Sequence, residues 1–500
     1  MPFLPFLMAD PLCRRQRIPC FGSERKLMVF SSLLFLFVFL SISMAVYLLV
    51  PARNRNMVLL ISSLIFYAWG GPRYLLLLLG ETLISYLCAI GIEKSHRQSQ
   101  SKMWIWIECV SLLGLLAIFK YLPLIGQTLQ TLTGWPAFIP GIVLPIGISF
   151  YTFQLLSYVI DVYRKEVRAQ YSYWKLLLYS SLFHQCIAGP IVRYKTVADE
   201  IDNRSVTIND VYAGIRRFSI GLAKKAVLAN GMGALADQLA PIDGGALASA
   251  SALSVWAGLF CYMLQIYLDF SAYSDMAVGM GRMVGFHYLE NFNYPYQAKS
   301  VQDFWRRWHI SLSTFFRDYV YIPLGGSRGT TLVYVRNMIT VWFLTGLWHG
   351  ASWNYVLWGL YYLCFLLLER FVIRQRIPSG WNRLYTLSVV FFGWILFRYE
   401  DLGVLTTAFA GMFGFTQGGW FSWSAWSEIL SNCFLIAAGV IACTDLGVKL
   451  EKVLSITANK NSVCFALYCL DQLLLPVLLL LISVLALIGN VYNPFLYFQF

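Results

Sequence analysis

Long apolar runs recur through most of this chain, from residue 28 to residue 490, and several approach the length that crosses a lipid bilayer. A transmembrane helix needs roughly 20 predominantly apolar residues, because its backbone must satisfy its own hydrogen bonds inside the hydrocarbon. A membrane β-barrel would instead show short segments of alternating hydrophobicity. Only 13% of the residues are charged, against about 25% in a typical soluble protein. The sequence therefore predicts an all-α fold, a polytopic transmembrane helical bundle.

We expect roughly ten to thirteen membrane-embedded helices, since each span takes about 20 residues. The most distinct runs are 28–50, 57–70, 74–92, 103–121, 139–160, 254–285, 341–372, 384–397, 429–448 and 473–491. Residues 173–192 are less regular and contain Gly189 and Pro190. Such broken stretches are tolerated at membrane depth only beside protein or a water-filled cavity. We therefore expect re-entrant or tilted helices in this part of the chain.

The Lys and Arg residues behind the net charge of +13 lie mostly in short loops between the apolar runs. Under the positive-inside rule, loops rich in Lys and Arg lie on the cytoplasmic side of the membrane. The positive charge therefore indicates topology and not a nucleic-acid partner. Basic loops follow the first, third and fifth runs, which predicts an N-terminus outside the cytoplasm. The basic residues of segment 1–27 favour the opposite orientation. We expect segment 1–27 to be a disordered or untranslated N-terminal extension, with a functional domain of residues 28–500 that begins at Met28; the alternative is that later helices override the tail.

The segment 303–328, DFWRRWHISLSTFFRDYVYIPLGGSR, combines cations with aromatic residues before a Pro/Gly break. Taken alone it indicates an amphipathic interfacial helix, with its aromatic residues at headgroup depth and its arginines toward water. That interpretation does not account for His309, nor for His349 near the end of a later apolar span. Gly346 and Gly350 flank His349 and let another group approach closely. Because burying an ionisable side chain in a membrane costs free energy, each histidine is a candidate functional residue.

A lone histidine in a helix is more often a hydrogen-bonded core side chain than a catalytic residue. The surrounding sequence must therefore distinguish between these two roles. A neutral imidazole near pH 7 can accept a proton from a hydroxyl or thiol during acyl transfer. The sequence offers no Walker loop, no H-E-x-x-H and no zinc-ligand spacing, so no metal site is expected. Gly325, Ser327 and Gly329 match G-x-S-x-G, but that nucleophile elbow requires an α/β sheet, so Ser327 is expected to be a loop residue. The two histidines, on separate segments, are therefore candidates for one shared cavity.

The segments around these histidines, FWRRWHISLSTFFRDYVYIPLGG and LTGLWHGASWNYVLWG, form a distinctive pair. Further distinctive segments are MVFSSLLFLFVFL, LIFYAWGGPRYLLLL, LPIGISFYTFQLLSYVIDVYR, HQCIAGPIVRY and YLDFSAYSDMAVGMGRMVGF. Together they resemble the membrane-bound O-acyltransferase family, and within it the bacterial branch that includes alginate O-acetyltransferase. The resemblance covers nearly everything from residue 28 to about residue 397 and excludes residues 1–27.

The resemblance implies that His349 is the catalytic histidine and that His309 is its companion, with re-entrant and interfacial helices around a central tunnel. It also implies an acetyl donor on the cytoplasmic side, namely acetyl-CoA, without a bound cofactor. The acceptor would be an extracytoplasmic polysaccharide, with alginate as the expected polymer. A periplasmic or membrane-anchored acetyltransferase would be the partner, because no separate polymer-binding domain is visible in the sequence. The implied location is the bacterial inner (cytoplasmic) membrane, with many passes through the lipid bilayer.

Four further residues are expected to bind substrate: Arg306, Arg307, Trp348 and Asp269. The two arginines would meet donor phosphates, although basic residues beside membrane spans usually contact lipid headgroups. Asp269 lies one helical turn from Tyr273, so the two side chains can share a face. A structural hydrogen-bond pair that lines the core is the favoured role for Asp269, with a catalytic role as the alternative.

A secondary transporter is the main rival function, because broken helices and buried ionisable residues also describe substrate pathways. Transporters commonly show corresponding interruptions in two halves, whereas the chemical signals here concentrate at residues 303–350. Within the enzyme class, peptidoglycan, cellulose and other exopolysaccharides are the alternative acceptors, and a relative transfers D-alanyl groups to teichoic acids. The sequence favours an O-acetyltransferase and leaves the acceptor open.

Overall fold

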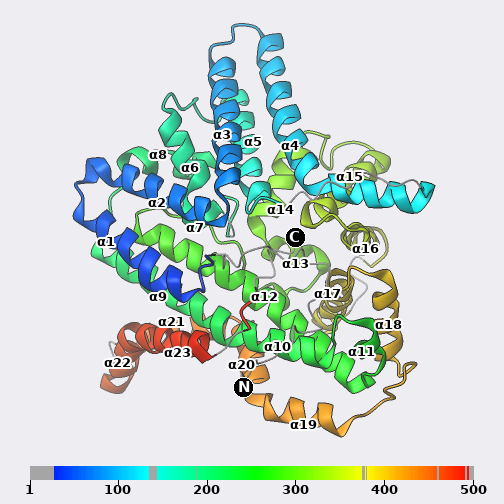
Figure 1. Cartoon of the computed structure of the whole chain (residues 1–500). Coiled ribbons are helices and arrows are strands. Elements are labelled where there is room, and N and C mark those ends of the chain that lie inside the picture. The colour runs from blue at the N-terminus through cyan, green and yellow to red at the C-terminus, as the bar shows by residue number, and fades with distance from the viewer. Residues whose placement is uncertain are drawn as a thin grey trace, which may run out of the picture.

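The computed structural model describes residues 28–134, 144–186, 189–373, 378, 380–458, 461–489 and 492–494, and every regular element within these ranges is a helix (Figure 1). The expectation for residues 1–27 lies outside the described residues. The first ten α-helices are α1 Ser41–Leu49, α2 Arg55–Gly70, α3 Pro72–Glu93, α4 Gln98–Thr133, α5 Ile148–Tyr163, α6 Tyr173–Ser181, α7 Phe183–Cys186, α8 Tyr194–Asn203, α9 Ile208–Ala223 and α10 Asn230–Leu239.

The remaining α-helices complete the all-α fold. They are α11 Gly244–Ala248, α12 Ala252–Met283, α13 Val301–Arg307, α14 Ile310–Phe316, α15 Thr331–His349, α16 Trp353–Leu368, α17 Asn382–Arg398, α18 Leu402–Met412, α19 Trp423–Ser431, α20 Cys433–Ala442, α21 Leu446–Ala458, α22 Ser462–Cys469 and α23 Leu475–Gly489. Short 3-10 or π-helical segments extend or join them at Phe35–Leu40, Ala52–Asn54, η4 Lys224–Ala229, Pro295–Gln297, Arg317–Tyr321, η7 Glu369–Ile373 and Leu470–Leu474.

Five helices of the described chain are long and apolar enough to cross a membrane, which confirms the polytopic helical bundle. They are Pro72–Glu93, Gln98–Thr133, Ala252–Met283, Trp353–Ile373 and Ser462–Gly489. The helices α19 and α20 add a sixth candidate, a broken span that bends by 58°. Other expected runs fold as shorter apolar helices such as Phe35–Leu49. The total of ten to thirteen membrane-embedded helices stays a prediction.

The helix α12 runs through the middle of the molecule and is buried along most of its length (Figure 1). Its C-terminal half packs in one apolar core with α2, α3, α5 and α9, and its N-terminal half packs in a second core with α10, α16 and α17. Gly279 on α12 meets Gly214 on α9, and a Cβ on either would lie within 2.7 Å of the other's carbonyl oxygen. A helix that is apolar on all sides must be surrounded by other elements. The helix α12 therefore joins the two cores.

Two segments that the sequence indicates as continuous helices are broken in the structure, and both breaks carry a histidine. The expected run 341–372 was wrong as one span, because α15 ends at His349 and α16 begins only at Trp353. A Cβ on Gly350 would overlap the ring of Tyr355, so the glycine lets α16 fold back against α15. The expected interfacial helix 303–328 was also wrong as one element, since α13 and α14 are separated by Trp308 and His309.

Several aromatic residues of segment 303–328 pack against protein and do not form an exposed interfacial face. Trp308, Phe315 and Phe316 are each at most 5% exposed. Phe315 stacks on Phe153 of α5, with ring centroids 4.2 Å apart. The expected break in residues 173–192 is confirmed, because α6 ends at Ser181 and the short α7 follows after Leu182.

Candidate active site

The structure brings the two predicted catalytic histidines together. His349 is the last residue of α15, and His309 lies in the break between α13 and α14. Both are buried, with 5% and 1% of their surfaces exposed. The indole ring of Trp348 contacts both imidazoles, with centroid distances of 5.0 Å to His349 and 5.7 Å to His309. Residues 40 positions apart in the sequence therefore share one aromatic neighbour, as the two motifs predict.

Aromatic rings enclose the imidazole of His349. Trp358 and Phe397 meet it edge-on, with centroid distances of 4.9 Å and 5.4 Å. No described protein atom makes a hydrogen bond to Nδ1 or Nε2 of this ring. A buried polar atom without a partner costs about 1–3 kcal/mol, so native cores rarely keep one without a function. The imidazole of His349 is thus not a satisfied core side chain, and both nitrogens are available to a reacting group.

The backbone at His309 adopts the left-handed conformation, with φ 44° and ψ 57°. Few residues other than glycine adopt this conformation, although histidine does so more readily than most. The turn directs the imidazole inward, where the ring of Phe270 on α12 packs edge-on at 4.7 Å. Asn291 accepts a hydrogen bond from the ring through its Oδ1 atom, 3.2 Å from Nδ1. His309 is therefore fixed on one side, while its Nε2 atom receives no hydrogen bond from the described residues.

A buried lysine holds the end of α15 beside His349. Lys120 on α4 donates to the backbone oxygen of Trp348, and its ammonium lies 5.8 Å from the centre of that indole ring. Tyr121 donates to the backbone oxygen of Leu347 at 2.7 Å. These carbonyls belong to the last turn of α15, where helical partners are missing and a cation is favoured. Sequence reasoning did not find this role for Lys120, although an isolated cation in the apolar run 103–121 was the available signal.

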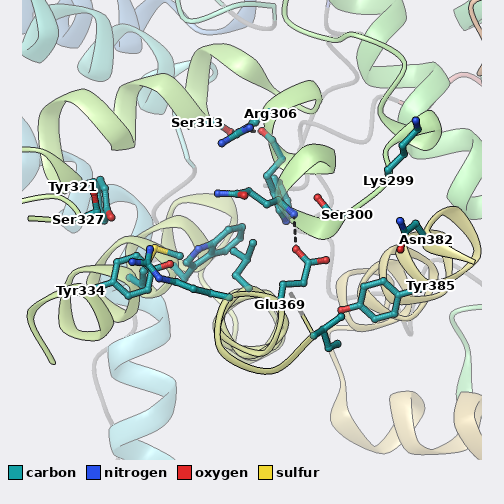
Figure 2. A pocket seen from close by; sticks show the side chains of 17 residues that line it. Lys299, Ser300, Arg306, Ser313, Tyr321, Ser327, Tyr334, Glu369, Asn382 and Tyr385 are labelled. Atoms are coloured by element: carbon teal, nitrogen blue, oxygen red, sulfur yellow. Dashed lines mark hydrogen bonds between the residues drawn. The ribbon is translucent and has the colours of Figure 1, made fainter. Parts of the chain in front are cut away.

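A cavity of about 860 Å³ lies on the far side of Trp305 from Trp358, and Figure 2 shows the side chains that line it. Arg306 and Lys299 stand on one side of it, and Glu369 with Tyr385 on the facing side. The remaining lining residues include Trp305, Trp342, Ser313, Tyr321, Ser327, Tyr334 and Arg370. The indole of Trp305 lies 5.4 Å from Trp358, whose ring contacts His349. The cavity therefore reaches Trp305, the neighbour of one ring that contacts the candidate base, but His349 does not line it. A continuous central tunnel stays a prediction.

The two predicted substrate-binding arginines differ in their surroundings. Arg306 is exposed and lines the cavity. Arg307 forms an ion pair with Asp303, one helical turn earlier, at 2.9 Å, and also donates to the backbone oxygen of Asn293. The cavity described above does not include Arg307 among its lining residues. The geometry thus supports a ligand-facing position for Arg306 and a local ion pair for Arg307. Ser327, expected in a loop, lies in a turn and also lines the cavity.

Asp269 forms a buried ion pair with Lys225, a residue of η4, at 2.7 Å. Both side chains are at most 3% exposed, and Lys225 also donates to the backbone oxygen of Pro494. Tyr273, the expected partner of Asp269, shares a hydrogen bond with Ser31 at 3.3 Å. Sequence reasoning missed Lys225 because it lies 44 positions from Asp269, on another helix. A direct substrate role for Asp269 stays a prediction.

Known proteins are similar to this chain over much of its length. The model of the family described as MBOAT, membrane-bound O-acyltransferase, matches residues 161–408 and so includes both histidines. A probable alginate O-acetylase of Pseudomonas aeruginosa is 40% identical over 78% of this chain and 75% of its own length. A peptidoglycan O-acetyltransferase of Helicobacter pylori is 31% identical over 77% of this chain and 80% of its own length.

A more distant relative, a teichoic acid D-alanyltransferase of Bacillus subtilis, is 27% identical over 50% of this chain and 68% of its own length. The names of all three relatives describe acyl transfer. Their names therefore favour an enzyme over the transporter alternative. The chain belongs to the membrane-bound O-acyltransferase family, and it is a membrane acyltransferase.

Proposed function

We propose that this enzyme transfers acetyl groups from acetyl-CoA on the cytoplasmic side of the bacterial inner membrane to an extracytoplasmic polysaccharide, with alginate as the acceptor. The observation that carries the proposal is the imidazole of His349, which is buried and has neither nitrogen hydrogen-bonded to a described protein atom. Its neighbour Trp358 contacts Trp305, which lines the cavity. An imidazole in that state can accept a proton from an attacking hydroxyl. Relatives named as alginate O-acetylases support the choice of acetyl group and polymer.

The cavity has the chemistry expected of a site for a phosphorylated acetyl donor. Lys299, Arg306 and Arg370 line it, and cations of this kind bind phosphate groups. Membrane proteins concentrate Lys and Arg on the cytoplasmic side. These cations support entry of acetyl-CoA from the cytoplasm, without a resident cofactor.

In the proposed reaction, His349 takes the proton of the acceptor hydroxyl while the hydroxyl oxygen bonds to the acetyl carbonyl carbon. The carbon–sulfur bond of the thioester then breaks, and the proton passes from the imidazole to the departing thiolate. The products are an acetyl ester and free coenzyme A. Trp348 contacts both imidazoles, and we assign His309 a supporting role, in which its Nε2 atom accepts a hydrogen bond from a reacting group. The aromatic enclosure limits competing hydrolysis by excluding water.

The donor half of this proposal is tested with membranes that contain the protein together with the proposed partner acetyltransferase, supplied with acetyl-CoA labelled in the acetyl group. We expect label to appear in alginate at a rate that depends on the wild-type chain. Membranes that contain His349→Gln at a matched protein level are the control. Equal incorporation by the two membranes, or transfer from another thioester but not from acetyl-CoA, would reject the assignment of donor and base.

We further infer that a periplasmic or membrane-anchored acetyltransferase partner completes delivery to the polymer. Support comes from the apolar character of the chain, which is 58% hydrophobic and places five span-forming helices in its described part. Purified protein in liposomes should consume acetyl-CoA slowly and leave external alginate unmodified until the partner is added. Efficient acetylation of alginate by the purified protein alone would contradict this part of the proposal. Peptidoglycan and cellulose are the comparison acceptors, and a preference for either would reassign the polymer.

A further inference from the structure

A short segment, residues 291–293, holds the turn that carries His309. It does so through backbone hydrogen bonds and through separate side-chain hydrogen bonds. The backbone N–H of Ile310 donates to the backbone oxygen of Asn291 at 2.9 Å. On the other side of the turn, the backbone N–H of Asn293 donates to the backbone oxygen of Arg307 at 2.9 Å. These two bonds bracket the left-handed residue and do not involve any side chain. The backbone clamp therefore remains when the side chain of Asn291 is changed.

The side chain of Asn291 makes a second set of contacts inside the turn. Its Oδ1 atom accepts from the backbone N–H of Ser311 at 3.1 Å and from the hydroxyl of Ser311 at 2.8 Å. Its Nδ2 atom donates to the hydroxyl oxygen of Ser274 on α12 at 3.2 Å. The side chain is 1% exposed and joins the turn to the central helix. No role for this asparagine follows from the sequence motifs alone.

These contacts determine which nitrogen of His309 carries the proton. A backbone N–H can only donate, so the Asn291 atom that faces Ser311 must be the oxygen. The hydroxyl hydrogen of Ser311 points to this oxygen as well, because 2.8 Å is much shorter than the 3.4 Å from that hydroxyl to Nδ1 of His309. Nδ1 of His309 lies 3.2 Å from the same acceptor oxygen and must donate to it. The neutral ring therefore has its hydrogen on Nδ1 and its lone pair on Nε2.

We propose that Asn291 is a positioning residue that holds His309 in the tautomer with a free lone pair on Nε2. The inference rests on the proposed function, because it gives His309 the role of a hydrogen-bond acceptor beside His349. Without Asn291 the ring can exchange tautomers or rotate, and it then presents an N–H group where an acceptor is needed. The loss affects the chemical step and leaves the donor cavity unchanged, since Asn291 is not among the residues that line that cavity.

The elements packed around His309 present few titratable groups. The helix α12 contributes Phe270, and the segment 291–293 contributes Phe292 at a ring distance of 6.4 Å. On α15 the titratable group is His349, and on α4 it is Lys120, which reaches the backbone oxygen of Trp348. No carboxylate makes a hydrogen bond or ion pair with His309 among the described residues. A new carboxylate at position 291 would therefore act on His309 directly.

The test compares Asn291→Asp with Asn291→Ser in membranes that transfer acetyl from acetyl-CoA. The aspartate keeps an acceptor for Nδ1 but adds a negative charge, which favours the protonated imidazolium. We expect the acid limb of the pH profile of kcat to move to higher pH by about one unit. The serine is too short to reach Nδ1, so kcat should fall about tenfold, the scale of one lost hydrogen bond, with an unchanged KM for acetyl-CoA.

Asn293→Asp is the matched control, because this exposed residue lies two positions away and adds the same charge. Its pH profile should match that of the wild type. An unshifted profile in Asn291→Asp, an equal shift in Asn293→Asp, or a wild-type kcat in Asn291→Ser would each overturn the inference. If the wild-type protein itself transfers no acetyl from acetyl-CoA, the donor proposal fails instead, so the two failures are distinguishable. If Asn291→Asp does not accumulate in membranes, the kcat and KM of Asn291→Ser test the positioning role of Asn291.

Discussion

The molecule buries polar groups in two regions near α12, and the two regions satisfy them differently. On one side, Asp275 is paired with Lys224 at 2.8 Å and with Arg217 at 2.6 Å, and Asp269 is paired with Lys225. On the other side, the imidazole of His349 is enclosed by aromatic rings that offer no hydrogen bond to either nitrogen. Burying either kind of group removes it from water and costs free energy. Of the two, only the carboxylates offset this cost through partners within the protein.

This difference separates structural polar groups from reactive ones. A buried charge with complete partners resists chemistry, because any reaction must first break the ion pair. A neutral imidazole avoids the larger cost of burying a charge, and its free nitrogens can bond to a substrate. The comparison predicts that substitutions in the ion-paired region reduce folded protein, whereas substitutions in the aromatic region reduce turnover at an unchanged protein level.

The largest effect is expected for His349→Gln. Glutamine keeps some hydrogen bonding but cannot act as a general base, so acetyl transfer should fall by about a hundredfold to ten thousandfold. Acetylation measured at matched membrane protein levels checks this. Retention of even a tenth of wild-type acetylation would show that the histidine only packs, and the catalytic assignment would have to be withdrawn.

His309→Gln should also impair transfer, because the substitution removes the acceptor that faces the reacting groups. The double variant of His309 and His349 should be little worse than His349→Gln alone, since residues that act as a unit are not additive. Rates of the two single variants and the double variant, measured in one membrane preparation series, test this coupling. Independent, multiplicative losses would separate the two histidines functionally.

In the ion-paired region, Asp269→Leu should destabilise the fold by about 3–5 kcal/mol, because it leaves the ammonium of Lys225 buried without its carboxylate. The double variant Asp269→Leu with Lys225→Met should recover much of the folded protein. Size-exclusion profiles and melting temperatures of the detergent-solubilised variants measure the difference. A stable, correctly folded Asp269→Leu protein that is inactive would instead place Asp269 in substrate binding and break the comparison.

The smallest effect is expected at the cavity. Arg306→Ala should raise the KM for acetyl-CoA about twofold to fivefold with little change in kcat, because an exposed charge pair contributes about 1 kcal/mol or less. Arg307→Ala should raise the KM less, since Arg307 is already paired with Asp303 and lies outside the cavity lining. Steady-state kinetics over a range of acetyl-CoA concentrations compares them. A larger KM effect at Arg307 would reverse the assignment of the two arginines.

Sequence patterns predicted the helical class, the family and the two histidines, because apolar composition and short motifs depend only on local residues. The break after His349 was not predicted, because the sequence GASW continues an apolar run. Only the structure shows that the ring of Tyr355 occupies the space beside Gly350. The same limit applies to segment 303–328, whose amphipathic pattern indicates a surface helix although Trp308, Phe315 and Phe316 are buried.

The partners of the buried polar groups were the part that sequence could not supply. Lys225 and Asp269 meet across two helices, and Lys120 reaches a carbonyl 228 positions away in the chain. Asn291 precedes His309 by 18 positions and has no periodic signal of its own. Such contacts depend on how the helices pack, and helix packing is not encoded in any single segment.

The position of His349 between the two apolar cores has a consequence for the newly synthesised protein. Trp348 belongs to the core built largely from the earlier helices, while Trp358 and Phe397 belong to the second core, to which α17 contributes Phe397. A nascent chain released before α17 has been inserted lacks one wall of the enclosure. We therefore expect unfinished chains to be unable to consume acetyl-CoA, so that the cell's acetyl supply is exposed to this imidazole only after its full surroundings have assembled.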